Sequence, residues 1–174
     1  PDLVESDFSA AGLKYAKDDK GRMLSLPWSV DYFILYYNKE MFEKKGVAVP
    51  KTFDEMVAAA EKLTDPAAGT FGFVGRGLRN ANMTLWTNFF LNYGGEFLDA
   101  KGDILTDGPE GVEATKLYQK LLTKYAPPGV AGFNWMESMA SFTQGRSAMW
   151  LDGVGWAPPL EDPAASRIVG KVGY

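Results

Sequence analysis

Cysteine and histidine are both absent from the 174-residue sequence. Their absence excludes disulfide bonds, thiol chemistry and any serine or cysteine nucleophile that histidine would activate. It also removes the ligands that nearly all zinc sites use. We therefore expect no metal site in this protein.

Long apolar runs and dense basic clusters are missing too. No run approaches the roughly 20 apolar residues that cross a bilayer. The 18 Lys and Arg residues are outnumbered by 22 Asp and Glu residues, and the net charge is −4. Nucleic acid is therefore not an expected partner. The chain starts at Pro1 without a signal peptide, so we expect it to be a piece of a longer protein.

Apolar residues, by contrast, are plentiful enough for a folded core, at 46% hydrophobic and 14% aromatic. Strand-like and helix-like segments alternate along the chain, which predicts an α/β fold. We expect strands over 32–37, 70–75 and 147–151, a further strand beginning at 171, and a hairpin over 96–107 with its turn at 99–103. The strand over 32–37 is apolar on both faces, as in the middle of a sheet.

Capping signals mark the helices between these strands. Capping boxes at Thr52 with Glu55 and at Asn134 with Glu137 predict two helix starts, Asn38 caps a short helix that Gly46 ends, and further helices are expected around 8–15, over 80–93 and from Pro109. Helical spacing predicts two buried stripes, formed by Met83, Trp86, Phe90 and Tyr93 and by Val112, Leu117, Leu121 and Leu122.

Two short motifs resemble ligand loops, and we interpret both as structural. Gly75 and Gly77 follow a predicted strand, but the third glycine of a dinucleotide loop is missing. The segment 99–107 has some of the spacing of a calcium loop, yet it lacks the terminal Glu and the flanking helices. The first motif is thus expected to be a flexible loop and the second a hairpin turn.

Tryptophans in loops or beside polar residues are the strongest functional signal. Trp150 lies within a predicted strand and is expected in the core, whereas Trp156 follows an Asp152-Gly153 turn among Gly and Pro. Aromatic rings beside Asp and Asn suit a sugar or polyol, whose C–H face stacks on a ring while its hydroxyls meet amides and carboxylates. The ring candidates are Trp28, Trp86, Trp135 and Trp156, and the polar candidates are Asp31, Asn82 and Asp152. Core packing stays the alternative for Trp86 and Trp156.

Other functional classes stay open at this point. Asp31 and Asp152 both sit beside predicted strands and could form the carboxylate pair of a glycoside hydrolase. That reaction needs the two carboxyl groups about 5 Å or roughly 6.5–9.5 Å apart, a separation that sequence does not provide. A purely structural interaction module is a third possibility.

Several segments together resemble a known family. "LPWSVDYFILYYNKEMFEKKGV" (26–47), "PEGVEATKLYQKLL" (109–122) and "QGRSAMWLDG" (144–153) resemble the extracytoplasmic solute-binding proteins of sugar ABC transporters, of the maltose-binding type, and "PPGVAGFNW" (127–135) is similar to the polyol binders among them. The resemblance implies an α/β lobe of a two-lobed type II periplasmic-binding-protein fold, with a central sheet flanked by helices. It implies a sugar or polyol held between lobes and passed to ABC permease subunits, with no catalysis and no cofactor. It also implies the periplasm or the extracellular face, with a lipid anchor in a Gram-positive source.

The resemblance also assigns segments and residues. Residues 1–28 would be the tail of the first lobe, 29–171 the second lobe and 172–174 a return strand toward the hinge, so most of the first lobe would be missing from this chain. The family's ligand-binding positions match Asp31, Trp86, the Asp152-Gly153 turn and Trp156. Trp28, Asn82 and Trp135 complete the expected ligand contacts.

Overall fold

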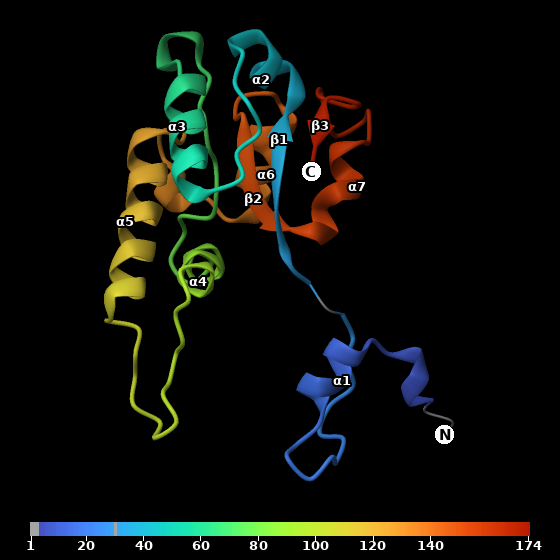
Figure 1. Ribbon diagram of the computed structural model, residues 1–174. Coiled ribbons are helices and arrows are strands. Elements are labelled where there is room, and N and C mark those ends of the chain that lie inside the picture. Colours follow the sequence, from blue (N-terminus) through green and yellow to red (C-terminus); the bar gives the residue numbers. More distant parts are fainter. Residues whose placement is uncertain (1–3, 30) are drawn as a thin grey trace. The chain divides into compact units, whose positions relative to one another are not determined.

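The computed structural model describes residues 4–29 and 31–174, and it divides into two compact units, Pro1–Tyr32 and Phe33–Tyr174 (Figure 1). The first unit contains a 3-10 turn, η1 (Glu5–Asp7), and a helix, α1 (Ala10–Ala16). The predicted helix near 8–15 starts at Ala10 because the Ser9 side chain caps it, accepting the Gly12 N–H at 3.1 Å. Over the described residues, no helix combines the length and apolarity that a membrane crossing requires.

The second unit is built on a three-stranded sheet in the order β2-β1-β3. Strand β1 (Phe33–Asn38) lies in the middle and pairs antiparallel with β2 (Met149–Gly153) and with β3 (Val172–Gly173). In the β1–β2 register, Phe33 faces Gly153 and Tyr36 faces Trp150. The predicted strands near 32–37, 147–151 and 171–174 are thus present, each shifted by one or two residues.

The predicted strand over 70–75 is wrong as a regular element. The segment forms only two isolated parallel bridges beside β2, Phe71 with Ser147 and Val74 with Trp150. Between them, the Phe73 N–H donates to the Tyr125 carbonyl at 3.0 Å instead of to β2. This detour interrupts the ladder, yet the segment still runs alongside β2 and carries its last residues to the end of that strand.

Helices cover both faces of this sheet: Figure 1 shows α3 and α5 on the opposite side from α7, and Phe142 of α6 packs in the same cluster as Leu160 of α7. The helices are α2 (Lys39–Lys45), α3 (Phe53–Leu63), α4 (Asn82–Asn92), α5 (Pro109–Lys124), α6 (Trp135–Thr143) and α7 (Ala157–Leu160), with 3-10 turns η2 (Pro66–Ala68), η3 (Val130–Gly132) and η4 (Val154–Trp156). The capping box at Asn134 and Glu137 is confirmed. At α3, Thr52 accepts the Glu55 N–H as predicted, but the Glu55 carboxylate accepts the Lys51 N–H, so that box is not reciprocal.

Alternate residues of the strands feed two hydrophobic clusters, one on each face. Leu35 and Leu151 join the larger cluster with α3, α4 and α5, whereas Tyr36 and Trp150 join the smaller cluster with α6 and α7. Tyr36 and Trp150 are fully buried and stack with ring centroids 5.2 Å apart. The prediction that β1 has two apolar faces and that Trp150 belongs to the core is confirmed.

Both predicted helix stripes are correct only in part, since Phe90, Leu117, Leu121 and Leu122 are buried as predicted. Met83, Tyr93 and Val112 are exposed, and the buried face of α4 consists of Leu85, Phe89 and Phe90. The error in α4 follows from an offset of a residue or so, because apolar or aromatic residues occupy adjacent positions at 85–86 and 89–91 and period alone does not select the face.

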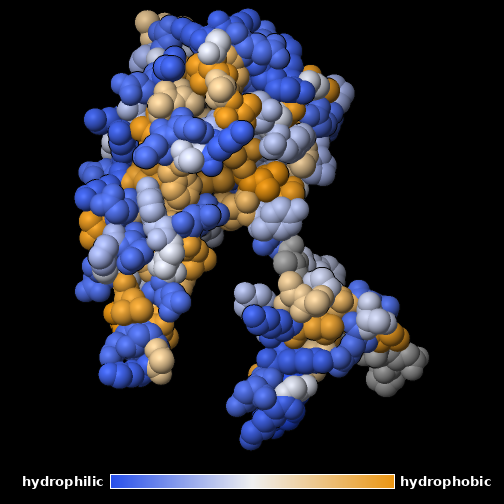
Figure 2. All heavy atoms as spheres, viewed as in Figure 1, coloured by the Kyte–Doolittle hydropathy of each residue, from blue (hydrophilic) through white to orange (hydrophobic). Residues whose placement is uncertain are grey.

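The hairpin between α4 and α5 is present, with its turn at the predicted place. Leu98 pairs with Ile104, and the Asp99 carboxylate accepts the backbone N–H groups of Lys101 and Asp103. Figure 2 shows apolar surface along this projecting segment, where Phe97, Leu98, Ile104 and Leu105 are exposed.

One glycine tests how closely the segment 70–75 packs on α3. A Cβ at Gly72 would lie 2.0 Å from the Ala60 backbone oxygen, so Gly72→Ala should lower the free energy of unfolding by roughly 2–3 kcal/mol, measured by urea denaturation. The control is Gly132→Ala, where nothing lies within 4 Å of the new Cβ. Equal losses in the two variants would show that the close packing is unimportant.

Candidate ligand-binding site

The carboxylate of Asp152, at the end of β2, is the centre of a polar cluster in the second unit. Asp152 is 0% exposed. The Arg76 guanidinium donates to both of its oxygens, from Nε to Oδ2 at 2.8 Å and from Nη2 to Oδ1 at 2.5 Å. Oδ1 also accepts the Gly153 N–H at 2.8 Å and the Trp156 indole N–H at 3.1 Å. Protein donors therefore surround this carboxylate.

Arg76 reaches Asp152 because of the parallel bridges described above. Val74 pairs with Trp150, so two residues further along each segment Arg76 comes beside Asp152. The guanidinium lies 5.9 Å from the centroid of the Phe33 ring, and the side chain is 15% exposed. Gly77 follows directly, where a Cβ would lie 2.2 Å from the Val130 oxygen. The glycines thus allow close packing on either side of Arg76, where a flexible loop was expected.

Sequence reasoning missed Arg76. The sequence Gly-Arg-Gly after the predicted strand was the one local indication of its role. Two closely packed glycines fix the backbone around the arginine, and this limits where its side chain can point. The meaning of this sequence depends on the alignment of 70–75 with 147–151, two segments that lie far apart in sequence.

Two of the predicted tryptophans form a stacked pair next to this carboxylate. The rings of Trp135, the first residue of α6, and Trp156, the last residue of η4, are 4.2 Å apart between centroids with an interplanar angle of 11°. Both side chains are only partly buried. Asp152 orients the Trp156 indole through its N–H, and the Tyr36 hydroxyl donates to the Gly153 carbonyl at 2.7 Å. The structure thus brings together the predicted site residues Trp135, Asp152, Gly153 and Trp156.

Asn82 and Trp86 lie one turn apart on α4, against α5. The Tyr118 hydroxyl of α5 donates to the Arg76 carbonyl at 3.1 Å. Burial raises the pKa of Tyr118, and the nearby Asn82 side chain partly offsets that rise. Trp86 is half-buried: it stacks on Phe90 at 4.9 Å and donates its indole N–H to the Thr115 hydroxyl at 2.9 Å.

Trp28 and Asp31 belong to the first unit. Trp28 is 98% exposed, and the Asp31 carboxylate accepts the Tyr32 N–H at 3.0 Å. Their predicted roles as ligand contacts stay predictions.

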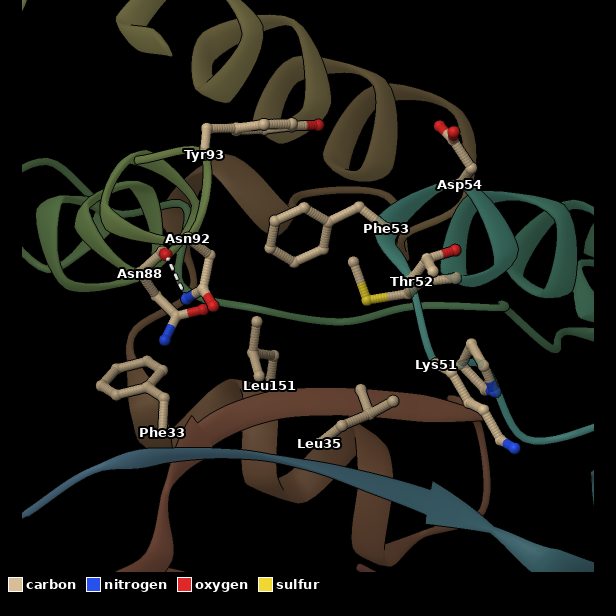
Figure 3. A pocket seen from close by; sticks show the side chains of 12 residues that line it. Phe33, Leu35, Lys51, Thr52, Phe53, Asp54, Asn88, Asn92, Tyr93 and Leu151 are labelled. Atoms are coloured by element: carbon tan, nitrogen blue, oxygen red, sulfur yellow. Dashed lines mark hydrogen bonds between the residues drawn. The ribbon is translucent and has the colours of Figure 1, made fainter. Parts of the chain in front are cut away.

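A pocket of about 560 Å³ opens beside the Arg76 cluster, a volume within the range of small-molecule sites (Figure 3). Its apolar floor comes from the sheet, with Phe33, Leu35 and Leu151, and Phe33 is also the ring beneath Arg76. Figure 3 shows Asn88 and Asn92 of α4 at one end of the pocket. The Asn92 side-chain amide donates to the Asn88 backbone carbonyl at 2.8 Å.

The remaining wall of the pocket consists of the start of α3 and Tyr93. Burial and the nearby Asp54 and Glu113 carboxylates raise the pKa of Tyr93. Across residues 4–29 and 31–174 no group of three or more acidic side chains could hold a metal ion. Sequence analysis missed this pocket, because its residues come from four segments with unremarkable local patterns.

The chain is similar to a probable amino-acid ABC transporter periplasmic-binding protein from Sinorhizobium fredii, at 29% identity over 100% of this chain and 41% of that protein. It is 27% identical to the mannitol-binding protein of Pseudomonas aeruginosa, over 89% of this chain and 36% of that protein.

Among solved structures, a solute-binding protein of an ABC transporter from Agrobacterium radiobacter K84, crystallised with ribitol, superposes with a TM-score of 0.87. It is 35% identical, over 97% of this chain and 42% of that chain. Residues 1–174 match the bacterial extracellular solute-binding protein family along their whole length, and the chain belongs to that family. The chain has the fold of part of a type II periplasmic-binding protein. It spans about two fifths of the length of these relatives.

The Arg76–Asp152 pair generates an asymmetric stability prediction. Arg76→Gln leaves a fully buried carboxylate without its cation and should cost about 3–5 kcal/mol of unfolding free energy. Asp152→Asn leaves a partly exposed guanidinium and should cost less, about 1–3 kcal/mol. The double variant should lose less than the sum of the two, as measured by denaturant unfolding. Additive losses would mean that the pair does not interact.

The stacked indoles generate a spectroscopic prediction. Closely stacked tryptophans couple their electronic transitions, so the wild-type protein should show an exciton couplet in far-ultraviolet circular dichroism. Trp135→Phe and Trp156→Phe should each remove it, whereas Trp28→Phe, at an exposed position, should leave it unchanged. A couplet that survives both substitutions would contradict the pairing.

Proposed function

We propose that this chain supplies one wall of a site for a polyol or sugar in a solute-binding protein of an ABC importer. The observation that carries the proposal is the partly exposed Trp135–Trp156 stack, fixed in direction by the buried Asp152 carboxylate. An aromatic platform beside hydrogen-bond donors suits the C–H faces and hydroxyls of such ligands. The relatives named for mannitol and crystallised with ribitol support the same ligand class.

In this proposal Asp152 positions other groups and does not itself touch the ligand. Its carboxylate is 0% exposed and already accepts hydrogen bonds from Arg76, Gly153 and Trp156. The ligand contacts would come from the indole faces, from the N–H groups of Arg76 that Asp152 does not use, and from the asparagines of the adjoining pocket.

The same burial argues against the glycoside hydrolase reading. A general acid or nucleophile must reach the glycosidic bond, and Asp152 offers no open oxygen. The reading as a purely structural module is disfavoured as well, because a module that uses its tryptophans only for packing would bury both rings of the Trp135–Trp156 pair.

The partners follow from the family and belong to the same proposal. The first lobe of the same polypeptide would form the opposite wall of the site, in accordance with relatives more than twice as long as this chain. ABC permease subunits would receive the ligand at the periplasmic or extracellular face of the membrane, with lipid anchoring of the protein in a Gram-positive source. One wall alone should bind more weakly than a complete cleft, because only half of the ligand surface is desolvated.

Titration with ribitol, mannitol and maltose, followed by calorimetry or NMR, tests the proposal. We expect saturable binding, weaker than micromolar for residues 1–174 by themselves. Trp135→Ala and Trp156→Ala should each weaken it roughly three- to tenfold, as expected for loss of one stacking contact. Phe97→Ala, an exposed ring on the hairpin outside the site, is the matched control and should leave the affinity unchanged.

Three other results would contradict parts of the proposal. Saturable binding of amino acids in place of polyols would overturn the ligand class. Micromolar or tighter binding by these residues alone would overturn the one-wall arrangement. Hydrolysis of chromogenic glycosides, abolished in Asp152→Asn, would support the enzyme instead.

A further inference from the structure

We propose that the Arg76–Asp152 pair makes this site selective for uncharged polyhydroxy ligands and that Asp152 is the residue that rejects anions. The inference rests on the proposed function, since it assumes that the ligand lies against Trp135, Trp156 and Arg76. It goes further because it names the two side chains that select a ligand by its charge.

The geometry of the ion pair carries the first step. Arg76 uses its Nε and Nη2 atoms on the two oxygens of Asp152, which is the bidentate arrangement that an arginine would otherwise offer to a carboxylate or phosphate ligand. Over residues 4–29 and 31–174, Asp152 is the only side chain that pairs with this guanidinium in a salt bridge. The face of Arg76 best suited to an anion is therefore already occupied by the protein.

Burial carries the second step. Asp152 is 0% exposed and the Arg76 side chain 15% exposed, so solvent screens the pair poorly and the two charges cancel within the site. The remaining N–H groups of Arg76 can still donate to neutral hydroxyls. The guanidinium thus provides directed donors without a net positive charge.

The surroundings point in the same direction. The stacked indoles beside the pair and the Phe33 ring beneath it present electron-rich faces, which repel anions. The chain as a whole carries a net charge of −4, and this field disfavours anionic ligands further.

Matched neutral and anionic probes test the inference. The purified protein and its Asp152→Asn variant are titrated at low ionic strength with ribitol and ribonate, and with mannitol and mannonate, which differ within each pair by a terminal carboxylate. The wild-type protein should prefer the neutral member at least tenfold. In Asp152→Asn the freed guanidinium should shift this ratio toward the anion by at least tenfold. The Arg76→Gln/Asp152→Asn variant, which lacks both charges, should not show the gain.

The possible results distinguish a failure of this inference from a failure of the proposed function. Wild-type binding of ribitol or mannitol without an Arg76-dependent gain for the anion in Asp152→Asn overturns the inference alone. Wild-type affinities within tenfold for the neutral and anionic members also overturn it. No saturable binding of any neutral probe overturns the proposed function and the inference together. If Asp152→Asn is unfolded by circular dichroism, Asp152→Ser, which is smaller and keeps an oxygen acceptor, repeats the comparison with the same expected gain.

Discussion

The desolvation of one carboxylate is the constraint on which the rest of the site depends. An aspartate buried as completely as Asp152 is tolerated only when a cation and enough hydrogen-bond donors replace its water. Those donors come from Arg76 and from the backbone and indole that follow Asp152 itself. Once they are in place, the position of Arg76, the path of the chain after β2 and the plane of the Trp156 ring are all fixed together.

The same network joins elements on both sides of the sheet. Arg76 links the end of β2 to the α4–α5 contact through its carbonyl, which the Tyr118 hydroxyl reaches. Trp156 links it to α6 through the stack with Trp135. One buried charge therefore connects the residues of the proposed site on both sides of the sheet.

Local signals in the sequence were sufficient for the caps of α2 and α6 and for the two-faced strand β1, because each depends on residues within one or two turns. They did not predict α7, and they gave a strand over 70–75 that the structure does not contain. The resemblance to solute-binding proteins led to the right family and fold. The buried face of α5 was predicted correctly except at Val112, whereas in α4 only Phe90 of the four predicted residues is buried. Arg76 and the pocket could not be predicted, because they depend on pairing between 70–75 and β2 and on four segments that only the tertiary fold brings together.

The hydrogen bond from the Trp156 indole to Asp152 also bears on stereochemistry. It engages the one polar atom of that ring, so under the proposed function a guest would meet the ring through its flat hydrocarbon face. The hydroxyl groups of the guest would then be hydrogen-bonded by the guanidinium and amide groups. Exchanging those groups would alter which isomer is preferred while the aromatic platform stays the same.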